Sequence, residues 1–259
     1  MKINKVIIIF LLIISLFSGV VIASEVSAAE NNIYVSLSGD DSSGNGSSDN
    51  PYNSIGKAIN QSTDSDKNII YLDEGIYKGD NNTKIEISKF HKNQEGSISI
   101  IGKGVDKTYI DGSSISYLFN ISSNSIVYLH NLTILNCTNI NGGAIVNYGT
   151  LTITNCNFEN NNATQRGGAI WNNGTLVINN SRFKNNQVTT IQGATNKDYG
   201  GGAIVSHGAL EVYDSIFDNN IAANNNVEPG GDGGAGGAIL ILDNINNVLI
   251  YNSTFTRNN

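Results

Sequence analysis

The sequence predicts an all-β protein, a right-handed single-stranded parallel β-helix (a solenoid) with a short N-terminal capping helix. The first observation is a repeat: Gly142 to Asn161, which begins Gly-Gly-Ala-Ile, returns with small changes from Gly167, Gly201 and Gly236. The second is alternation of apolar and polar residues within each copy, which is typical of strands. The third is spacing, because 24 residues separate Val127 from Leu151 and 25 separate Leu151 from Leu176. That length holds three short strands and three turns, one rung of such a coil.

The chain begins with an export signal. Lys2 and Lys5 precede an apolar run from Val6 to Val21, and small residues at 26–29 fit a signal peptidase. We expect residues 1–29 to be removed after Ala29, leaving a mature domain of residues 30–259. The alternative is a retained anchor, since the run is nearly long enough to span a bilayer. No later apolar stretch is long enough to do so.

Charge argues against a nucleic-acid partner. The formal net charge is −7, and loss of residues 1–29 makes it −8, because that segment holds Lys2, Lys5 and Glu25. An acidic chain repels phosphate backbones.

Residues 30–68 are predicted to form the N-terminal cap. Ile33 to Val35 has the pattern of a strand, and Ser54 to Asn60 that of a short helix, with Asn53 or Ser54 as N-cap. Residues 69–134 are predicted to form irregular rungs, and residues 135–259 are predicted to form the regular repeats. The strands expected in the irregular part are Ile69–Leu72, Lys84–Ile87, Ser97–Ile101, Thr108–Ile110, Leu118–Ile121 and Ile126–Ile134.

Alignment of the repeats predicts two structural ladders. Stacked amides hydrogen-bonding along the axis are expected at Asn131, Asn155, Asn180, Asp214 and Asn252. An aromatic stack inside the coil is expected at Phe158, Phe183, Phe217 and Phe255, preceded by Ile134. A third column, Glu159, Lys184 and Asp218, is expected to face outward with alternating charge and to support the register.

The repeats also carry a family resemblance. Each Gly-Gly-Ala-Ile is followed by a Phe-x-x-Asn motif, at Phe158–Asn161, Phe183–Asn186, Phe217–Asn220 and Phe255–Asn258. This pairing resembles the repeat motifs of the chlamydial polymorphic outer membrane proteins and looks equally like the adhesin-like surface proteins of methanogenic archaea. Residues 34–58 and 109–134 are similar to the N-terminal part of the wider pectin-lyase-like superfamily. The resemblance implies a parallel β-helix and an adhesin-like role, with C-terminal truncation as one interpretation, because no anchor follows the repeats.

The same scaffold hosts enzymes, so a polysaccharide lyase or glycoside hydrolase is the alternative function. Such an enzyme needs carboxylates clustered on neighbouring outward columns, with Arg or Lys beside them. The sequence instead scatters its carboxylates, and Arg166, Arg182 and Arg257 have no evident acidic cluster beside them. A non-catalytic binding or structural module is therefore the preferred hypothesis, with no catalytic residue assigned.

The sequence gives only weak signals for a metal site or a disulfide. Asp41-x-Ser43-x-Asn45-Gly46 begins like a calcium loop, but its twelfth position is Tyr52 where a Glu is needed. The tract Gly230–Gly234 occurs once, and His91, His130 and His207 have no ligand spacing. No cofactor or metal is therefore predicted, Ca²⁺ included. Cys137 and Cys156 fall in different columns, which favours two unpaired thiols.

The binding surface is predicted at one corner of the coil. Phe158 lies 9 residues before the next Gly-Gly-Ala-Ile, whereas Phe183 lies 18 and Phe217 lies 19 before theirs. The insertions, residues 187–200 and 221–235, therefore stack at the same turn, where solenoids place recognition. Candidate contact residues for a surface glycan or protein are Lys197, Asp198, Tyr199 and Glu228. An unconstrained spacer is the alternative. Self-association through an open C-terminal end is also expected, because the last rung has no cap.

Overall fold

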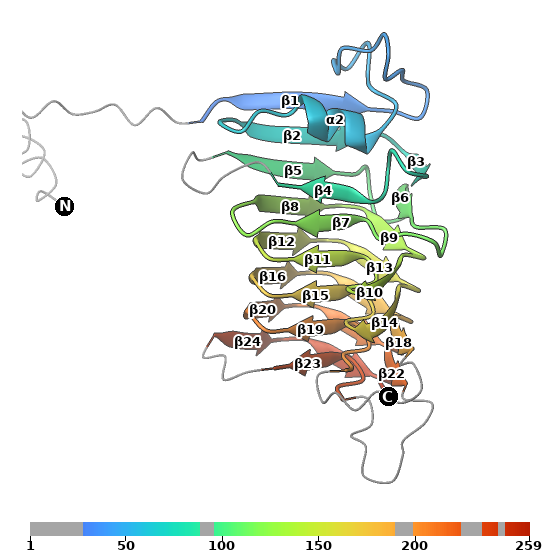
Figure 1. The fold of residues 1–259 in the computed structure, drawn as a ribbon, viewed down its shortest axis with the longest axis vertical. Helices are drawn as coiled ribbons and strands as arrows, with labels where there is room; N and C mark the ends of the chain where they lie inside the picture. The colour runs from blue at the N-terminus through green and yellow to red at the C-terminus, as the bar shows by residue number, and fades with distance from the viewer. Residues whose placement is uncertain (1–27, 89–95, 190–198, 224–234, 243–246) are drawn as a thin grey trace, which may run out of the picture.

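The chain winds into a right-handed parallel β-helix in the computed structural model, which describes residues 28–88, 96–189, 199–223, 235–242 and 247–259. The strands stack in four parallel sheets along the coil axis (Figure 1). A regular rung visits the sheets in turn, passing through β11, β12, β13 and β14 before β15 begins the next rung.

Sheet I holds the longest series: β1 (Glu30–Val35), β2 (Lys67–Leu72), β5 (Ser97–Ile101), β8 (Ile126–His130), β12 (Thr150–Thr154), β16 (Thr175–Asn179), β20 (Ala209–Tyr213) and β24 (Val248–Tyr251). Sheet II follows it in each rung: β3 (Gly75–Lys78), β6 (Thr108–Asp111), β9 (Thr133–Leu135), β13 (Asn157–Glu159), β17 (Arg182–Lys184), β21 (Ile216–Asp218) and β25 (Thr254–Thr256).

Sheet III is confined to the repeats: β10 (Thr138–Asn141), β14 (Asn162–Arg166), β18 (Gln187–Thr189) and β22 (Ile221–Ala223). Sheet IV closes the rung: β4 (Ile85–Ile87), β7 (Phe119–Ile121), β11 (Ile145–Asn147), β15 (Ile170–Asn172), β19 (Ile204–Ser206) and β23 (Ile239–Ile241). A regular rung therefore has four strands, whereas the sequence predicts three. The alternation pattern does not reveal the fourth strand, because Asn162–Arg166 carries one apolar residue, the buried Ala163.

The core is a set of apolar columns that run parallel to the axis. Leu151 pairs with Val127 in the rung before and with Leu176 in the rung after, and all three side chains are fully buried. Strict in-register stacking of this kind means that each rung supplies the missing half of its neighbour's core. The expected strand Ile126–Ile134 is divided between β8 and β9, because the chain turns a corner at Asn131.

Residues with a left-handed backbone conformation form the corners between sheets I and II. Asn131, Asn155, Asn180, Asp214 and Asn252 occupy this position, with φ values from 45° to 56°. Asn and Asp tolerate this backbone region better than other non-glycine residues. At the corner before sheet IV the requirement is stricter, since a Cβ on Gly142 would lie 2.0 Å from the carbonyl oxygen of Ile145. Only glycine fits there.

The inner face carries an amide ladder formed by the last residue of each Phe-x-x-Asn motif. Asn161, Asn186 and Asn220 are completely buried, and each donates its side-chain amide to the next member, ending at Asn258, over 2.9 Å. The same amide of Asn186 also donates to the carbonyl of Phe158, at 2.9 Å. The buried side-chain amides of this ladder therefore have hydrogen-bond partners, which lowers the cost of burying them.

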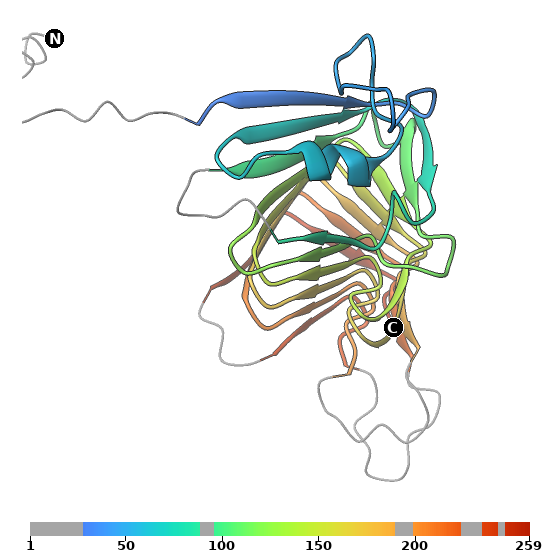
Figure 2. The same ribbon diagram turned by 45° about the horizontal axis from the view of Figure 1, so that its top comes forward.

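The first end of the coil is covered by α2 (Ile55–Gln61), which lies beside β1 and β2 (Figure 2). Its N-cap is Ser54, whose hydroxyl accepts from the amide of Lys57. Ile55, Ala58 and Ile59 form its buried face, so that the helix closes the apolar end of the columns. The described part of the chain contains no helix long and apolar enough to cross a lipid bilayer.

Candidate functional site

The insertion corner is built on sheet III. The first insertion begins with β18, the second begins with β22, and these two strands are paired. The residues that end the insertions, Gly200 and Ala235, are bridged to each other, so both insertions leave and rejoin the coil at neighbouring positions. The guanidinium of Arg166 lies over the ring of Tyr199, 5.4 Å from its centroid, which fixes the end of the first insertion against the rung. Lys197, Asp198 and Glu228 lie outside the described residues.

The aromatic column stacks without interruption through the regular repeats. Phe158 and Phe183 lie 4.7 Å apart between ring centroids, Phe183 and Phe217 4.9 Å, and Phe217 and Phe255 4.8 Å. Of the corner amides, Asn155 donates to Asn131 over 2.7 Å, and Asn252 donates to Asp214. Asn131 is half-buried rather than buried. These columns hold the rungs in register and leave no group free for chemistry.

The charged column differs from the expectation at Asp218. Its side chain is only 5% exposed, whereas the sequence suggests an outward, solvated carboxylate. The partners are not Lys184 but two arginines: Arg257 donates bidentately at 2.7 Å, and Arg182 donates at 3.3 Å. The hydrogen bonds from Arg257, together with those from Thr256 and Arg182, hold the pKa of the Asp218 carboxyl below its usual value. Asp218 therefore ties three successive rungs together.

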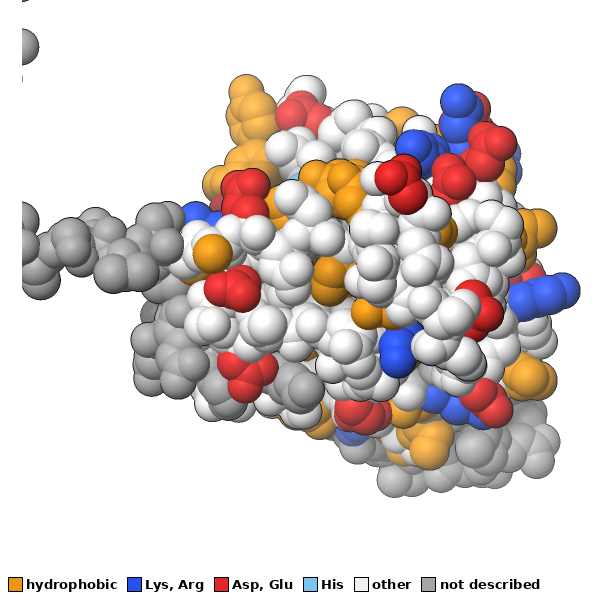
Figure 3. Space-filling model, turned by 90° about the horizontal axis from the view of Figure 1, so that it is seen from above, with side chains coloured by type: hydrophobic (Ala, Val, Ile, Leu, Met, Phe, Trp, Pro, Cys, Tyr) orange, Lys and Arg blue, Asp and Glu red, His pale blue; other side chains and the backbone are white. Residues whose placement is uncertain are grey.

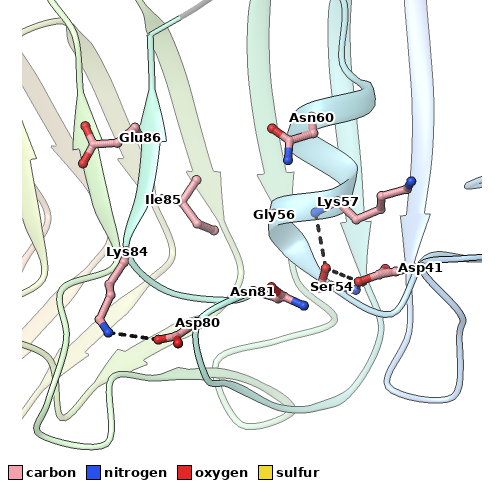
Figure 4. Close-up of a pocket in the computed structure, with 10 residues that line it drawn as sticks. All are labelled: Asp41, Ser54, Gly56, Lys57, Asn60, Asp80, Asn81, Lys84, Ile85 and Glu86. Atoms are coloured by element: carbon pink, nitrogen blue, oxygen red, sulfur yellow. Dashed lines mark hydrogen bonds and ion pairs between the residues drawn. The ribbon is translucent and has the colours of Figure 1, made fainter.

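A cleft of about 500 Å³ opens between α2 and β4. Figure 4 shows Lys57 and Asn60 on the helix and Asp80, Lys84 and Glu86 on the opposite wall. We call this the cap cleft. Its floor is fixed, because the amide of Gly56 donates to the carbonyl of Asn81 at 2.8 Å and Asn82 accepts from the amide of Ile55.

Several polar side chains in the cap cleft are already partnered. Lys84 pairs with Asp80 at 2.9 Å, and Asp41 accepts from the amides of Asn53 and Ser54 and from the Ser54 hydroxyl. Tyr117 donates to Glu86 at 2.8 Å; burial, and then this hydrogen bond, raise the pKa of Tyr117 to about 12. The wall carries both acidic and basic side chains, as does the cap end of the molecule shown in Figure 3. These contacts join the cap to the first rungs.

Side-chain oxygens in and beside the segment that begins like a calcium loop accept hydrogen bonds from nearby backbone amides. Asp40 accepts from the amides of Ser42 and Ser43, and Asn45 accepts from the amide of Ser47. Asp41 points to the helix N-cap, as described above. Within the described ranges there is no group of three or more His, Cys, Asp or Glu side chains that could hold a metal ion. Gly230–Gly234 and His91 lie outside those ranges.

The two cysteines have a structural role. Cys137 and Cys156 are free and buried, and burial raises the pKa of each thiol to about 12. Each one starts a ladder: the amide of Cys137 donates to Asn161 and that of Cys156 to Ser181. Burial lowers the pKa of His130 on the outer face of sheet I. His207 lies 5.6 Å from Trp171 between ring centroids.

No protein-family model matches the chain, and no curated protein matches it significantly. Among solved structures, the chain is similar to the pectin methylesterase from Aspergillus niger. Its deglycosylated form gives a TM-score of 0.38 at 13% identity, over 92% of this chain and 88% of that one. A second form of the same enzyme, with an N-acetylglucosamine stub, gives a TM-score of 0.33 at 14% identity over the same shares.

Proposed function

We propose that this protein is an exported, non-catalytic binding module that acts at the cell envelope and engages a surface glycan or protein through its insertion corner. The observation that carries the proposal is the placement of the two long insertions on paired strands, with Gly200 and Ala235 bridged at their ends. Two insertions that leave and rejoin adjacent rungs at neighbouring positions can contribute residues to one binding site. This is how rigid scaffolds display recognition loops.

The frame suits that role because it is stiff in the rungs that carry the insertions. The stacked rings of Phe158, Phe183 and Phe217 and the buried amide ladder run through these rungs. Such a frame holds the ends of both insertions in place, which lowers the entropic cost of binding at those ends. Tyr199, stacked on Arg166, is the aromatic side chain of the first insertion that the structure describes, and it is the expected contact residue there.

Export is supported by the start of the fold. A cut after Ala29 leaves Glu30, the first residue of β1, at the new N-terminus. The cut retains the whole of β1 and falls beside one hydrogen bond of the described residues, from the amide of Lys67 to the carbonyl of Ala29 at 2.8 Å. Mass spectrometry of the secreted protein tests this. A mature N-terminus at Glu30 is expected, and intact residues 1–29 on the secreted protein would contradict it.

The functional test compares the mature chain with a variant in which both insertions are trimmed to the 9-residue spacing of the first repeat. We expect the trimmed variant to keep its thermal melt and to lose binding on a glycan array and to immobilised cell-surface protein. A Tyr199→Ala variant should weaken the same binding by about tenfold. Trimmed protein that binds as well as the parent would place the site elsewhere on the coil.

The enzymatic alternative is tested on the same preparation. Polygalacturonate and other acidic glycans are incubated with the mature chain and with a heat-killed control. The proposal expects no product above the control. Product formation would replace the binding role with a lyase or hydrolase activity.

A further inference from the structure

A second cavity, of about 460 Å³, lies where β1, β2 and β5 end. Its walls come from the outer face of sheet I, the turn that follows Ser36, and Lys103 after β5. We call it the strand-end pocket. It is separate from the insertion corner, which lies on sheet III several rungs away.

Two tyrosines form the aromatic wall of this pocket. Tyr34 and Tyr71 are register partners on β1 and β2, and their rings stack with centroids 5.1 Å apart and planes 20° from parallel. Because β1 is the edge strand of sheet I, no further strand continues the column beyond Tyr34. Both rings are half-buried, and neither hydroxyl has a hydrogen-bond partner within the described residues.

Three further polar side chains of the pocket are also uncommitted. Asp49, Ser48 and Lys103 are exposed, and none of their side chains makes a hydrogen bond or ion pair within the described ranges. The cap cleft differs in this respect, because its Lys84 and Asp80 already pair with each other. A pocket that combines an aromatic wall with free donors and acceptors can exchange its water for a ligand's hydroxyl groups.

The backbone around the pocket is held in place. The hydroxyl of the fully buried Tyr77 contacts the carbonyls of Val35 and Asp73, at 3.1 and 3.2 Å. Thr108 donates to the same carbonyl of Asp73 at 3.1 Å and accepts from the amide of Lys103 at 3.0 Å. The free side chains therefore project from a preformed rim, which reduces the ordering cost of binding.

We propose that the strand-end pocket binds a short neutral oligosaccharide. The C–H face of a pyranose ring is apolar and weakly positive, and it packs on the negative face of an aromatic ring. Its hydroxyls then reach Asp49, Ser48 and Lys103, which offer both acceptors and donors. Two carboxylates, Asp49 and Asp73, and one ammonium group, Lys103, line the pocket, so that a neutral sugar is favoured over an acidic one. The volume suits a ligand of two or three sugar units.

This inference deepens the proposed binding role and rests on it. The strand-end pocket is a different site from the insertion corner, so an experiment can refute one site without refuting the other. The probes are cellotetraose, laminaritetraose, maltotetraose, mannotetraose and chitotetraose, titrated into the mature chain by calorimetry. At least one is expected to bind, and Tyr34→Ala and Asp49→Ala should each weaken it by about tenfold or more. Tyr213→Ala is the matched control, because Tyr213 lies on the outer face of the same sheet but outside the pocket. It should change the affinity by less than about twofold.

Asp49 makes no contact that the fold needs, so Asp49→Ala remains a fair test even if Tyr34→Ala loosens β1. No binding of any of the five sugars would overturn the inference, as would a dissociation constant unchanged in both pocket variants. Sugar binding that survives the pocket variants but is lost on trimming the insertions would refute the strand-end pocket and support the insertion corner. Binding that survives trimming but is lost in Asp49→Ala would support the pocket.

Discussion

Asn186 illustrates how much one side chain contributes to the coil. It is fully buried, accepts from the amide and side chain of Asn161, and donates to Asn220 and to the carbonyl of Phe158. Asn186→Ala leaves several of these buried groups without a partner, and we expect a loss of about 3–5 kcal/mol in unfolding free energy. Urea denaturation measures it. Asn185→Gly is the control, because Asn185 belongs to an exposed ladder at positive φ that glycine accepts; equal losses in the two variants would contradict the inward assignment.

Phe183 makes the corresponding apolar contribution. Its ring is fully buried between Phe158 and Phe217, so Phe183→Ala opens a cavity that neither neighbouring rung can fill. A loss of about 3–5 kcal/mol is expected. Thermal melts of Phe183→Ala and of Thr154→Ala, which lies on the outer face of sheet I, should differ widely. Equal shifts would show that Phe183 is not a core residue.

The sequence predicted some of these residues and not others, for a physical reason. The phenylalanines could be assigned because one apolar residue type returns at a fixed spacing. The asparagines of the Phe-x-x-Asn motif could not, since the first three motifs each end in two of them: Asn160, Asn185 and Asn219 form the exposed ladder, whereas Asn161, Asn186 and Asn220 turn inward. Which of two adjacent amides is buried depends on the left-handed turn at the first one, and residue identity alone does not reveal it.

At the scale of elements, Asp218 joins β21 to β17 and to the chain just after β25. Arg257 and Arg182 keep its pKa below the usual 3.8, so the folded state binds its proton less readily than the unfolded state does. The resulting stabilisation is fully present above about pH 4 to 5 and is lost as the pH falls through the lowered folded-state value.

Thermal melts of the parent and of Asp218→Asn across pH 2 to 7 test this linkage. The parent should melt higher at neutral pH, and the difference should shrink as the pH falls below 3.8. Asp80→Asn is the control, since Asp80 belongs to an exposed pair with Lys84 and should change little at any pH. A difference between parent and Asp218→Asn that is constant with pH would contradict an ionic role.

The two pockets illustrate the limit of prediction at this scale. Both lie in the first part of the chain, where rungs differ in length and no repeat gives a register. Tyr34 and Tyr71 could have been paired by aligning Ile33-Tyr34-Val35 with Ile70-Tyr71-Leu72, because each triplet has an apolar–aromatic–apolar order. The cap cleft offered no such signal, since it depends on how α2 packs against the turn that contains Asn81.

For the whole molecule, the two ends of the coil are unequal. The first is covered by α2, whereas the last described rung exposes 41% of Ile250 and 42% of Phe255, although their partners Val212 and Phe217 are fully buried. Strands β23, β24 and β25 are also edge strands of their sheets. An apolar surface with unpaired strand edges favours association. In the chain that ends at Asn259, we expect two such ends to meet about a two-fold axis and form a closed dimer.

Sedimentation velocity of residues 30–259 over a range of concentrations measures this association. Ile250→Lys should abolish it, because a charge on the end face must lose its water when the two ends meet. Tyr251→Lys is the matched control on the same strand: its side chain is 64% exposed, and it continues the outer column of Tyr213, so it should leave the dimer intact. A monomer at every concentration would refute the dimer, and an Ile250→Lys protein that associates as strongly as the parent would place the interface on another face.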